Sequence, residues 1–367
     1  MMKKQLLIIL AGILFAGSFA FQPVHASKIV ESDREVNQLD EAGSLAKYHD
    51  NNINGKNIKI AILDTGIDTT NRDLTFKKAI NFTSADSADS ADSADFTDRN
   101  GHGTKIAGII GARKNGEGLI GIAPSSELYI AKVANDSGKV AFAEVIKGLH
   151  WAVQQKVDII NISLEFGKGN EALKEAIDNA VEHDIIVVAS SGNIRTEGDT
   201  FKAYPGAYPD VISVGMLNVH GQIYADEFKE KKVDVYAPGE DLTSTYFDNK
   251  MTLDTGVSYA TAYASGYAAL VMEDKLSRDD SISRKSLLKT MKADLNQGIN
   301  GTPWYVYTAL VLNIVTVCAL LGLVIYALMY HRKTLPKKWP TKTIWIVIAS
   351  LVFINVIGRV MVYILSS

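Results

Sequence analysis

Cysteine is almost absent from this chain of 367 residues, which contains only Cys318. A single thiol cannot form a disulfide framework or a cysteine-built zinc site within one chain. Charge of one sign is also lacking, because 38 lysines and arginines face 41 aspartates and glutamates, for a formal net charge of −3. A near-neutral chain offers no basic surface for nucleic acid, so we expect no nucleic-acid partner.

Charged residues are missing from residues 6–21, which follow a pair of lysines near the N-terminus. A basic start, an apolar stretch and small residues at 24–26 are typical of an export signal. We therefore expect residues 1–26 to be a cleaved signal peptide. An uncleaved N-terminal anchor is the alternative, for which the apolar stretch is short. Either interpretation places the following domain outside the cytosol.

Two further charge-poor stretches lie near the C-terminus: residues 304–330 carry no charge, and residues 343–365 carry only Arg359. Each is long enough, at 1.5 Å per residue, to cross a bilayer of about 30 Å. Residues 331–342 between them contain basic but no acidic residues, which indicates a cytoplasmic loop. We expect a transmembrane helical hairpin, joined by a linker at 298–303 to an outward-facing domain. Two buried helices of a soluble domain are the alternative.

The region between these ends, residues 27–297, alternates short β-branched runs with helical patterns. This alternation predicts an α/β domain with a parallel sheet covered by helices on both faces. The expected strands are 57–63, 127–133, 157–163 and 185–189, and the expected helices are 103–112, 141–155, 171–183, 258–273 and 281–291.

One segment, residues 84–98, repeats Ala-Asp-Ser and supplies five aspartates. It lacks apolar anchors, so we expect a mobile loop. A solvated insertion is the favoured interpretation, and an acidic rim that attracts basic substrates or a cation is the alternative.

Three short motifs place Asp64, His102 and Ser258 in this order along the chain. Asp64 ends the apolar run in IAILDTG, His102 stands between two glycines in NGHGT, and Ser258 enters a helix of small residues in TGVSYAT. A serine hydroxyl needs a base within hydrogen-bond reach, and that base needs an orienting carboxylate. A cap serine, a loop histidine or a turn aspartate would singly mean little. Their order and glycine contexts together indicate a serine hydrolase site.

These motifs resemble the subtilisin-like serine protease (subtilase) family, over about residues 57–291. The resemblance implies that Asp64, His102 and Ser258 form a catalytic triad, which requires no cofactor. It also implies that the Asn193 side chain and the backbone N–H of Ser258 form the oxyanion hole. Val257 stands where the family usually has threonine and removes a hydroxyl that would assist that hole. We therefore expect activity slower or narrower than that of degradative relatives.

The resemblance further implies a polypeptide substrate that lies extended against two cleft edges, residues 136–140 and 163–167. An apolar pocket N-terminal to the scissile bond is expected from Phe142, Val145 and Leu164. Glu165 stands where many relatives have glycine, and its carboxylate either favours a basic substrate side chain or points to solvent. The full set of expected substrate-binding residues is Gly138, Phe142, Val145, Ser163, Leu164 and Glu165.

A structural Ca²⁺ site of the family type is one further expectation, because Asp73 and Asn115 fall at matching positions and oxygen ligands suit this ion. Arg113 and Lys114 argue against it. Secreted relatives carry a folding prodomain, whereas residues 27–56 leave room only for the domain's own N-terminal segment. Folding is then expected to be unaided or assisted by another molecule.

The function expected from these features is that of a serine endopeptidase, multi-pass in the cell membrane, with its catalytic domain outside. It would process exported peptides or proteins, for example by removing a leader. A catalytically silent relative that binds peptides or scaffolds a membrane complex is the second interpretation. A transport component is the third, although two spans without an acidic residue offer little of a pathway.

Overall fold

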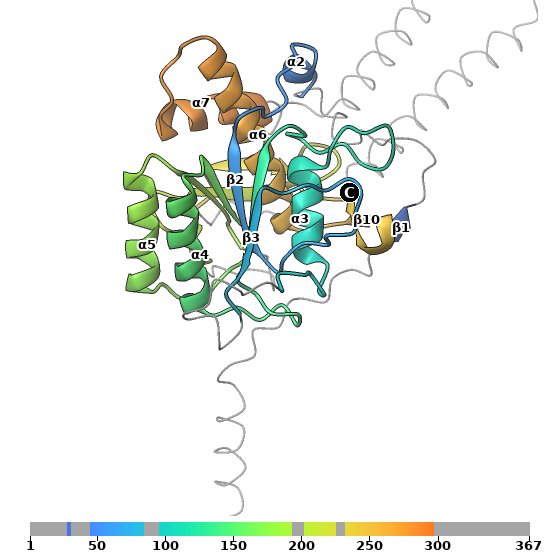
Figure 1. Cartoon of the computed structure of the whole chain (residues 1–367). Helices are drawn as coiled ribbons and strands as arrows, with labels where there is room; N and C mark the ends of the chain where they lie inside the picture. Colours follow the sequence, from blue (N-terminus) through green and yellow to red (C-terminus); the bar gives the residue numbers. More distant parts are fainter. Residues whose placement is uncertain (1–27, 31–44, 84–94, 193–201, 225–231, 297–367) are drawn as a thin grey trace, which may run out of the picture. The chain divides into compact units, whose positions relative to one another are not determined.

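The computed structural model describes residues 28–30, 45–83, 95–192, 202–224 and 232–296 (Figure 1). The chain divides into two units, residues 1–299 and 300–367, and the second lies outside the described residues. The expected signal peptide, linker, cytoplasmic loop and two membrane spans, and also Asn193, lie outside them too. Among the helices that are described, none has both the length and the apolar character needed to cross a membrane.

A seven-stranded sheet, in which every neighbouring pair is parallel, forms the centre of the described domain. Its first strand in the chain, β2, lies between β4 and β5 and is therefore internal. In spatial order the strands are β3 (Lys78–Asn81), β4 (Glu127–Lys132), β2 (Lys59–Asp64), β5 (Ile159–Ile162), β6 (Ile186–Ser190), β7 (Ile212–Leu217) and β8 (Val235–Pro238).

Helices cover both faces of the sheet, as the alternating pattern predicted (Figure 1). Ile60 and Ile62 of β2 pack into a core with helices α3 (His102–Gly111) and α6 (Val257–Ser277). Ala61 and Leu63 face the opposite core, with helices α4 (Phe142–Gln155) and α5 (Glu171–Glu182). Because successive strand residues point to opposite faces, a strand buried on both sides is expected to be mainly apolar. The expected parallel sheet with two covered faces is confirmed.

The expected elements agree with the observed ones to within a few residues. The strands predicted at 57–63, 127–133, 157–163 and 185–189 are β2, β4, β5 and β6, and the first four predicted helices are α3, α4, α5 and α6.

The last helix differs from expectation. It was predicted over 281–291, but α7 (Arg284–Leu295) begins three residues later and continues for four more. Ser283 sets the start, since its hydroxyl accepts the N–H of Ser286 in a reciprocal capping box. Leu295 is buried on the same face as Leu287, which explains why the helix continues.

A three-stranded antiparallel ribbon accompanies the sheet and was not predicted. It consists of β1 (Lys28–Val30), β10 (Met251–Asp254) and β9 (Leu242–Thr245), with a short 3₁₀ turn, η3 (Phe247–Asn249), between β9 and β10. Hydroxyl groups fasten the ribbon to α3: Ser244 donates to the carbonyl of Lys105, and Thr245 donates to the carbonyl of Thr104. The ribbon leads directly into α6, since β10 ends at Asp254 and α6 begins at Val257.

Lys232 fastens the loop that precedes β7. Its ammonium donates to three backbone carbonyls, those of Gly206 (3.2 Å), Tyr208 (2.8 Å) and Val211 (2.8 Å). The carboxylate of Asp234 lies 3.0 Å from the same nitrogen. Burial lowers the pKa of Lys232 even though Asp234 opposes that effect. Lys232 holds this loop together with Arg284, which donates to the carbonyls of Pro209 and Val211, both at 3.0 Å.

A small helix, α2 (Ala46–His49), lies at the end of the domain where β2 begins (Figure 1). The phenol of Tyr48 on α2 and that of Tyr267 on α6 both donate to Asp294 of α7, whose carboxylate also pairs with Lys47 at 2.6 Å. These contacts lie at the amino end of β2, whereas Asp64 lies at its carboxyl end.

Candidate active site

Asp64 is the last residue of β2 and is completely buried. Its Oδ1 lies 2.8 Å from Nδ1 of His102 and also accepts the backbone N–H of Thr65 at 2.8 Å. Ligand sites of parallel sheets lie beyond the carboxyl ends of the strands, so this position suits a functional carboxylate. The aspartate and histidine that the sequence singled out, 38 residues apart, are in direct contact.

His102 is the first residue of α3 and lies between two glycines. Gly101 has a φ of +96°, in the left-handed region that glycine adopts without strain. Gly103 lies so close to Gly66 that a Cβ there would come within 2.3 Å of the Gly66 carbonyl oxygen. The glycines on either side of His102 therefore serve the packing that brings its ring to Asp64.

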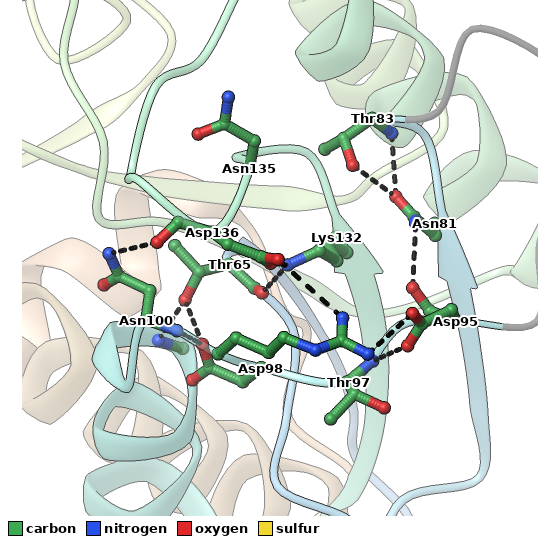
Figure 2. A network of polar contacts seen from close by, with 12 residues as sticks. Thr65, Asn81, Thr83, Asp95, Thr97, Asp98, Asn100, Lys132, Asn135 and Asp136 are labelled. Carbon is green, nitrogen blue, oxygen red and sulfur yellow. Dashed lines mark hydrogen bonds and ion pairs between the residues drawn. The ribbon is translucent and has the colours of Figure 1, made fainter.

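Asp98 anchors the same loop. Its Oδ1 accepts the Thr65 hydroxyl and the backbone N–H of Asn100 (Figure 2), and also the backbone N–H of Gly101. Its Oδ2 accepts both the N–H and the hydroxyl of Thr104. A carboxylate before a helix satisfies N–H groups that have no partner within the helix and interacts favourably with the helix dipole. Burial by itself raises the pKa of Asp98, but these hydrogen bonds outweigh it and the pKa is lowered.

The expectation of a mobile loop over residues 84–98 is therefore wrong at its end. Residues 84–94 lie outside the described ones, but Asp98 is buried and Asp95 pairs with Arg99 at 2.9 Å. Arg99 also lies 3.8 Å from Asp136, which accepts the ammonium of the buried Lys132 at 2.8 Å. Figure 2 shows these groups as one polar network between the loop and the predicted substrate edge.

Ser258 lies in the first turn of α6 and forms a reciprocal pair with Ser163, which follows β5 directly. The Ser258 hydroxyl donates to the Ser163 carbonyl, and the Ser163 hydroxyl donates to the Ser258 carbonyl, both at 3.0 Å. The ring of the next residue, Tyr259, lies 6.0 Å from that of His102. The structure thus brings Ser258 into the neighbourhood of the Asp64 and His102 pair, with its hydroxyl hydrogen directed at Ser163.

The charges around His102 favour its protonated form. Burial lowers the pKa of His102, but the charge and hydrogen bond of Asp64 and the charge of Asp98 raise it further, so that the net shift is upward. Lys105 acts in the opposite direction. A histidine held in this way is a stronger base than a free one, and it is active only when the pH is above its raised pKa.

The predicted substrate-binding residues belong to two segments, 138–145 and 163–165, of which Ser163 contacts Ser258. Phe142, at the start of α4, stacks on Phe166 with ring centroids 4.1 Å apart. Val145 and Leu164 are buried in the same apolar cluster, and Glu165 between Leu164 and Phe166 is half-buried. Gly138 is buried in a tight turn, with a φ of +75°. The pocket lining remains a prediction, to which the structure adds Phe166.

The two residues predicted to bind Ca²⁺ are in contact. The amide of Asn115 donates to Oδ1 of Asp73 at 3.0 Å, and the N–H of Leu119 donates to Oδ2 at 2.9 Å. The oxygen of the same amide accepts the N–H of Glu117. Asp73 and Asn115 thus bind each other and two backbone N–H groups, and calcium binding remains a prediction.

Sequence inspection did not identify a buried ion pair close to His102. Lys105, three residues further along α3, pairs with Asp254 of β10 at 2.9 Å, and both side chains are almost inaccessible to solvent. A signal was available, because Lys105 is the one charged residue in an otherwise small and apolar stretch, 103–112. A buried lysine requires a partner of opposite charge.

The comparisons with known proteins agree on one family. The model of the Subtilase family matches residues 55–302. The chain is 35% identical over 299 residues to the major intracellular serine protease of Bacillus subtilis (strain 168), covering 76% of this chain and 91% of that protein. It is 37% identical over 219 residues to subtilisin DY of Bacillus licheniformis, covering 59% and 77%, and 35% identical over 225 residues to a subtilisin of Bacillus pumilus, covering 61% and 80%.

Proposed function

The chain belongs to the subtilase family and is a subtilisin-type serine endopeptidase, and on this premise we propose that Asp64, His102 and Ser258 perform its chemistry. The observation that carries this assignment is the 2.8 Å contact between the buried Asp64 and His102, close to Ser258 at the start of α6. The proposed location is the outer face of a membrane, and the proposed substrates are exported peptides or proteins.

In the proposed mechanism, His102 removes the proton from Ser258 as the hydroxyl oxygen attacks the carbonyl carbon of the substrate. Asp64 holds Nδ1 of His102 protonated, so that Nε2 is the acceptor, and stabilises the imidazolium that forms. His102 then returns the proton to the leaving amine, and water repeats the sequence on the acyl-enzyme. Ser258 must first rotate away from the Ser163 carbonyl, a rearrangement common in enzymes without substrate.

The oxyanion in this mechanism is assigned to two donors. The N–H of Ser258 lies in the first turn of α6, where N–H groups have no acceptor within the helix and the dipole favours negative charge. The Asn193 amide is the proposed second donor. Val257 is completely buried and contributes only packing, which is consistent with a slower enzyme than one bearing a hydroxyl there.

A fluorophosphonate probe and a peptidase assay test the assignment together. The wild-type chain is expected to be labelled, and Ser258→Ala to lose both labelling and activity, with kcat lowered about 10⁶-fold. His102→Ala should cost a similar factor, and the double variant little more, because the triad acts as a unit. A catalytically silent relative would instead remain unlabelled while folded. Losses that multiply in the double variant would contradict the triad.

Membrane tethering is proposed from the two charge-poor stretches and the basic loop at 331–342. A tethered protease acts on molecules that pass close to it, which suits the maturation of exported precursors. Lys337→Cys tests the orientation, since an impermeant thiol reagent should label it only after cells are lysed. Cys318→Ser in the background removes the native thiol. Labelling of intact cells would reverse the proposed hairpin.

A further inference from the structure

The ion pair between Lys105 and Asp254 joins the two elements that carry the proposed base and nucleophile. Lys105 is one turn along α3 from His102, and Asp254 ends β10 four residues before Ser258. The ammonium and the carboxylate are 2.9 Å apart, and their side chains are 6% and 1% exposed. No solvent screens this pair, unlike a pair on the surface.

The surroundings of the pair are also ordered. The ammonium of Lys105 lies 5.1 Å from the centre of the Tyr246 ring, in the turn between β9 and β10. Two hydroxyl contacts of β9 with carbonyls of α3 hold the helix and ribbon together on either side. The position of Lys105 is thus determined by the ribbon and by its own helix.

We propose that Lys105 and Asp254 are positioning residues, which fix His102 relative to Ser258 and balance the negative charge that His102 experiences. This inference rests on the proposed function, because it assigns these residues to the base that the triad uses. The pair contributes a fixed positive charge on the α3 side and a fixed negative charge on the ribbon side. Removing Lys105 makes the charge near the imidazole more negative, and removing the charge of Asp254 makes it more positive.

The groups that face His102 come from four elements. Asp64 ends β2, Asp98 lies in the loop before α3, and both raise the pKa of His102, whereas Lys105 on α3 lowers it. From α6, Tyr259 packs against the ring; burial raises its own pKa, as does the charge of Asp254, so it is neutral. Two carboxylates therefore raise the pKa of His102, and Lys105 opposes them.

The test compares the pH dependence of kcat/KM for Lys105→Met, Asp254→Asn and the double variant. The acid limb of this profile reports the pKa of the base in the free enzyme. Lys105→Met removes the opposing charge and should move the limb to higher pH, by on the order of 0.5 unit. Asp254→Asn leaves the lysine uncompensated and should move the limb to lower pH. The double variant should fall between them, and Lys105→Arg should keep the wild-type limb.

A control variant separates the effect of charge from a loss of stability. Lys47→Gln removes an ion pair with Asp294 at the other end of β2 and should leave the limb unchanged. Limbs that do not move, or that move in the same direction for both single variants, would overturn the inference. If Lys105→Met fails to fold, two variants still test the inference. Asp254→Asn should move the acid limb to lower pH, whereas Lys105→Arg should leave it unchanged.

Failure of the proposed function and failure of the positioning role give different results. A wild-type protein without peptidase activity would remove the proposed function, whereas unshifted limbs in active variants would remove only the positioning role. The same shifts can be read without catalysis, from the titration of the His102 ring protons by NMR in a Ser258→Ala background. Opposite displacements there support the inference, and coincident titrations refute it.

Discussion

Replacing Asp98 by asparagine tests how the helix that carries His102 is held at its start. The carboxylate accepts five hydrogen bonds within 3.0 Å, three at Oδ1 and two at Oδ2. An asparagine keeps the first three but turns an NH₂ group toward the two donors of Thr104. Hydrogen bonds to a charged group contribute about 1.5–3 kcal/mol each, so losing two and opposing two donors should cost about 3–5 kcal/mol.

The measurement is urea unfolding of the full chain in a Ser258→Ala background, which prevents self-digestion. Asp95→Asn is the matched control, since Asp95 pairs with Arg99 on the surface and should change the free energy of unfolding by less than about 1 kcal/mol. Equal free energies of unfolding for Asp98→Asn and its parent would refute the reasoning. So would an equal loss for both variants.

The pH dependence of this effect has a definite sign. The folded-state pKa of Asp98 is lowered below its ordinary value of 3.8. Its contribution to stability is therefore fully present above that value and is lost as the pH falls through the lower, folded-state pKa. The difference between Asp98→Asn and its parent should shrink on acidification below about pH 4.

Three further predictions concern other parts of the domain. Lys232→Met should lower the free energy of unfolding by about 1–3 kcal/mol, because three carbonyls each lose a hydrogen bond, although Arg284 still donates to that of Val211. Lys174→Met, at a surface pair, should stay within about 1 kcal/mol, and equal losses would refute the role of Lys232. Glu165→Gln should lower kcat/KM roughly tenfold for substrates with a basic residue at the contacted position, because the carboxylate charge is lost, and leave apolar substrates nearly unchanged. If the peptide-library profiles of the two proteins superimpose, Glu165 is a solvated rim residue. Asn193→Leu should lower kcat by roughly 10²–10³ with KM nearly unchanged; a change confined to KM would assign Asn193 to substrate binding instead.

The parallel sheet was predictable because its internal strands are buried on both faces. Strands such as β2 and β6 are continuous apolar runs, which carry a strong local signal. The ribbon gives no such signal: β9 and β10 are four residues each, rich in threonine, and exist through pairing with each other and contact with α3. Elements that depend on tertiary contacts of this kind cannot be found from local pattern.

The candidate site was predictable where a motif marks it and not where it depends on burial. Asp64 and His102 lie in recognisable contexts, and the structure places them in contact. Asp98 was predicted in a mobile loop because it belongs to a row of similar aspartates; only its position before α3 distinguishes it. Lys105 is the one charged residue of the stretch 103–112, and its partner Asp254 is 149 residues away.

The lysine that organises the loop before β7 has a consequence for how that loop responds to its surroundings. A dissolved ion bound by the same three carbonyls would stabilise the loop only in proportion to its free concentration and affinity, by mass action. Lys232 supplies its positive charge through its own chain, so the charge has no dissociation constant. Neither dilution nor a chelator can remove it. The loop that precedes β7 should therefore keep its shape in media whose ionic composition the cell does not control.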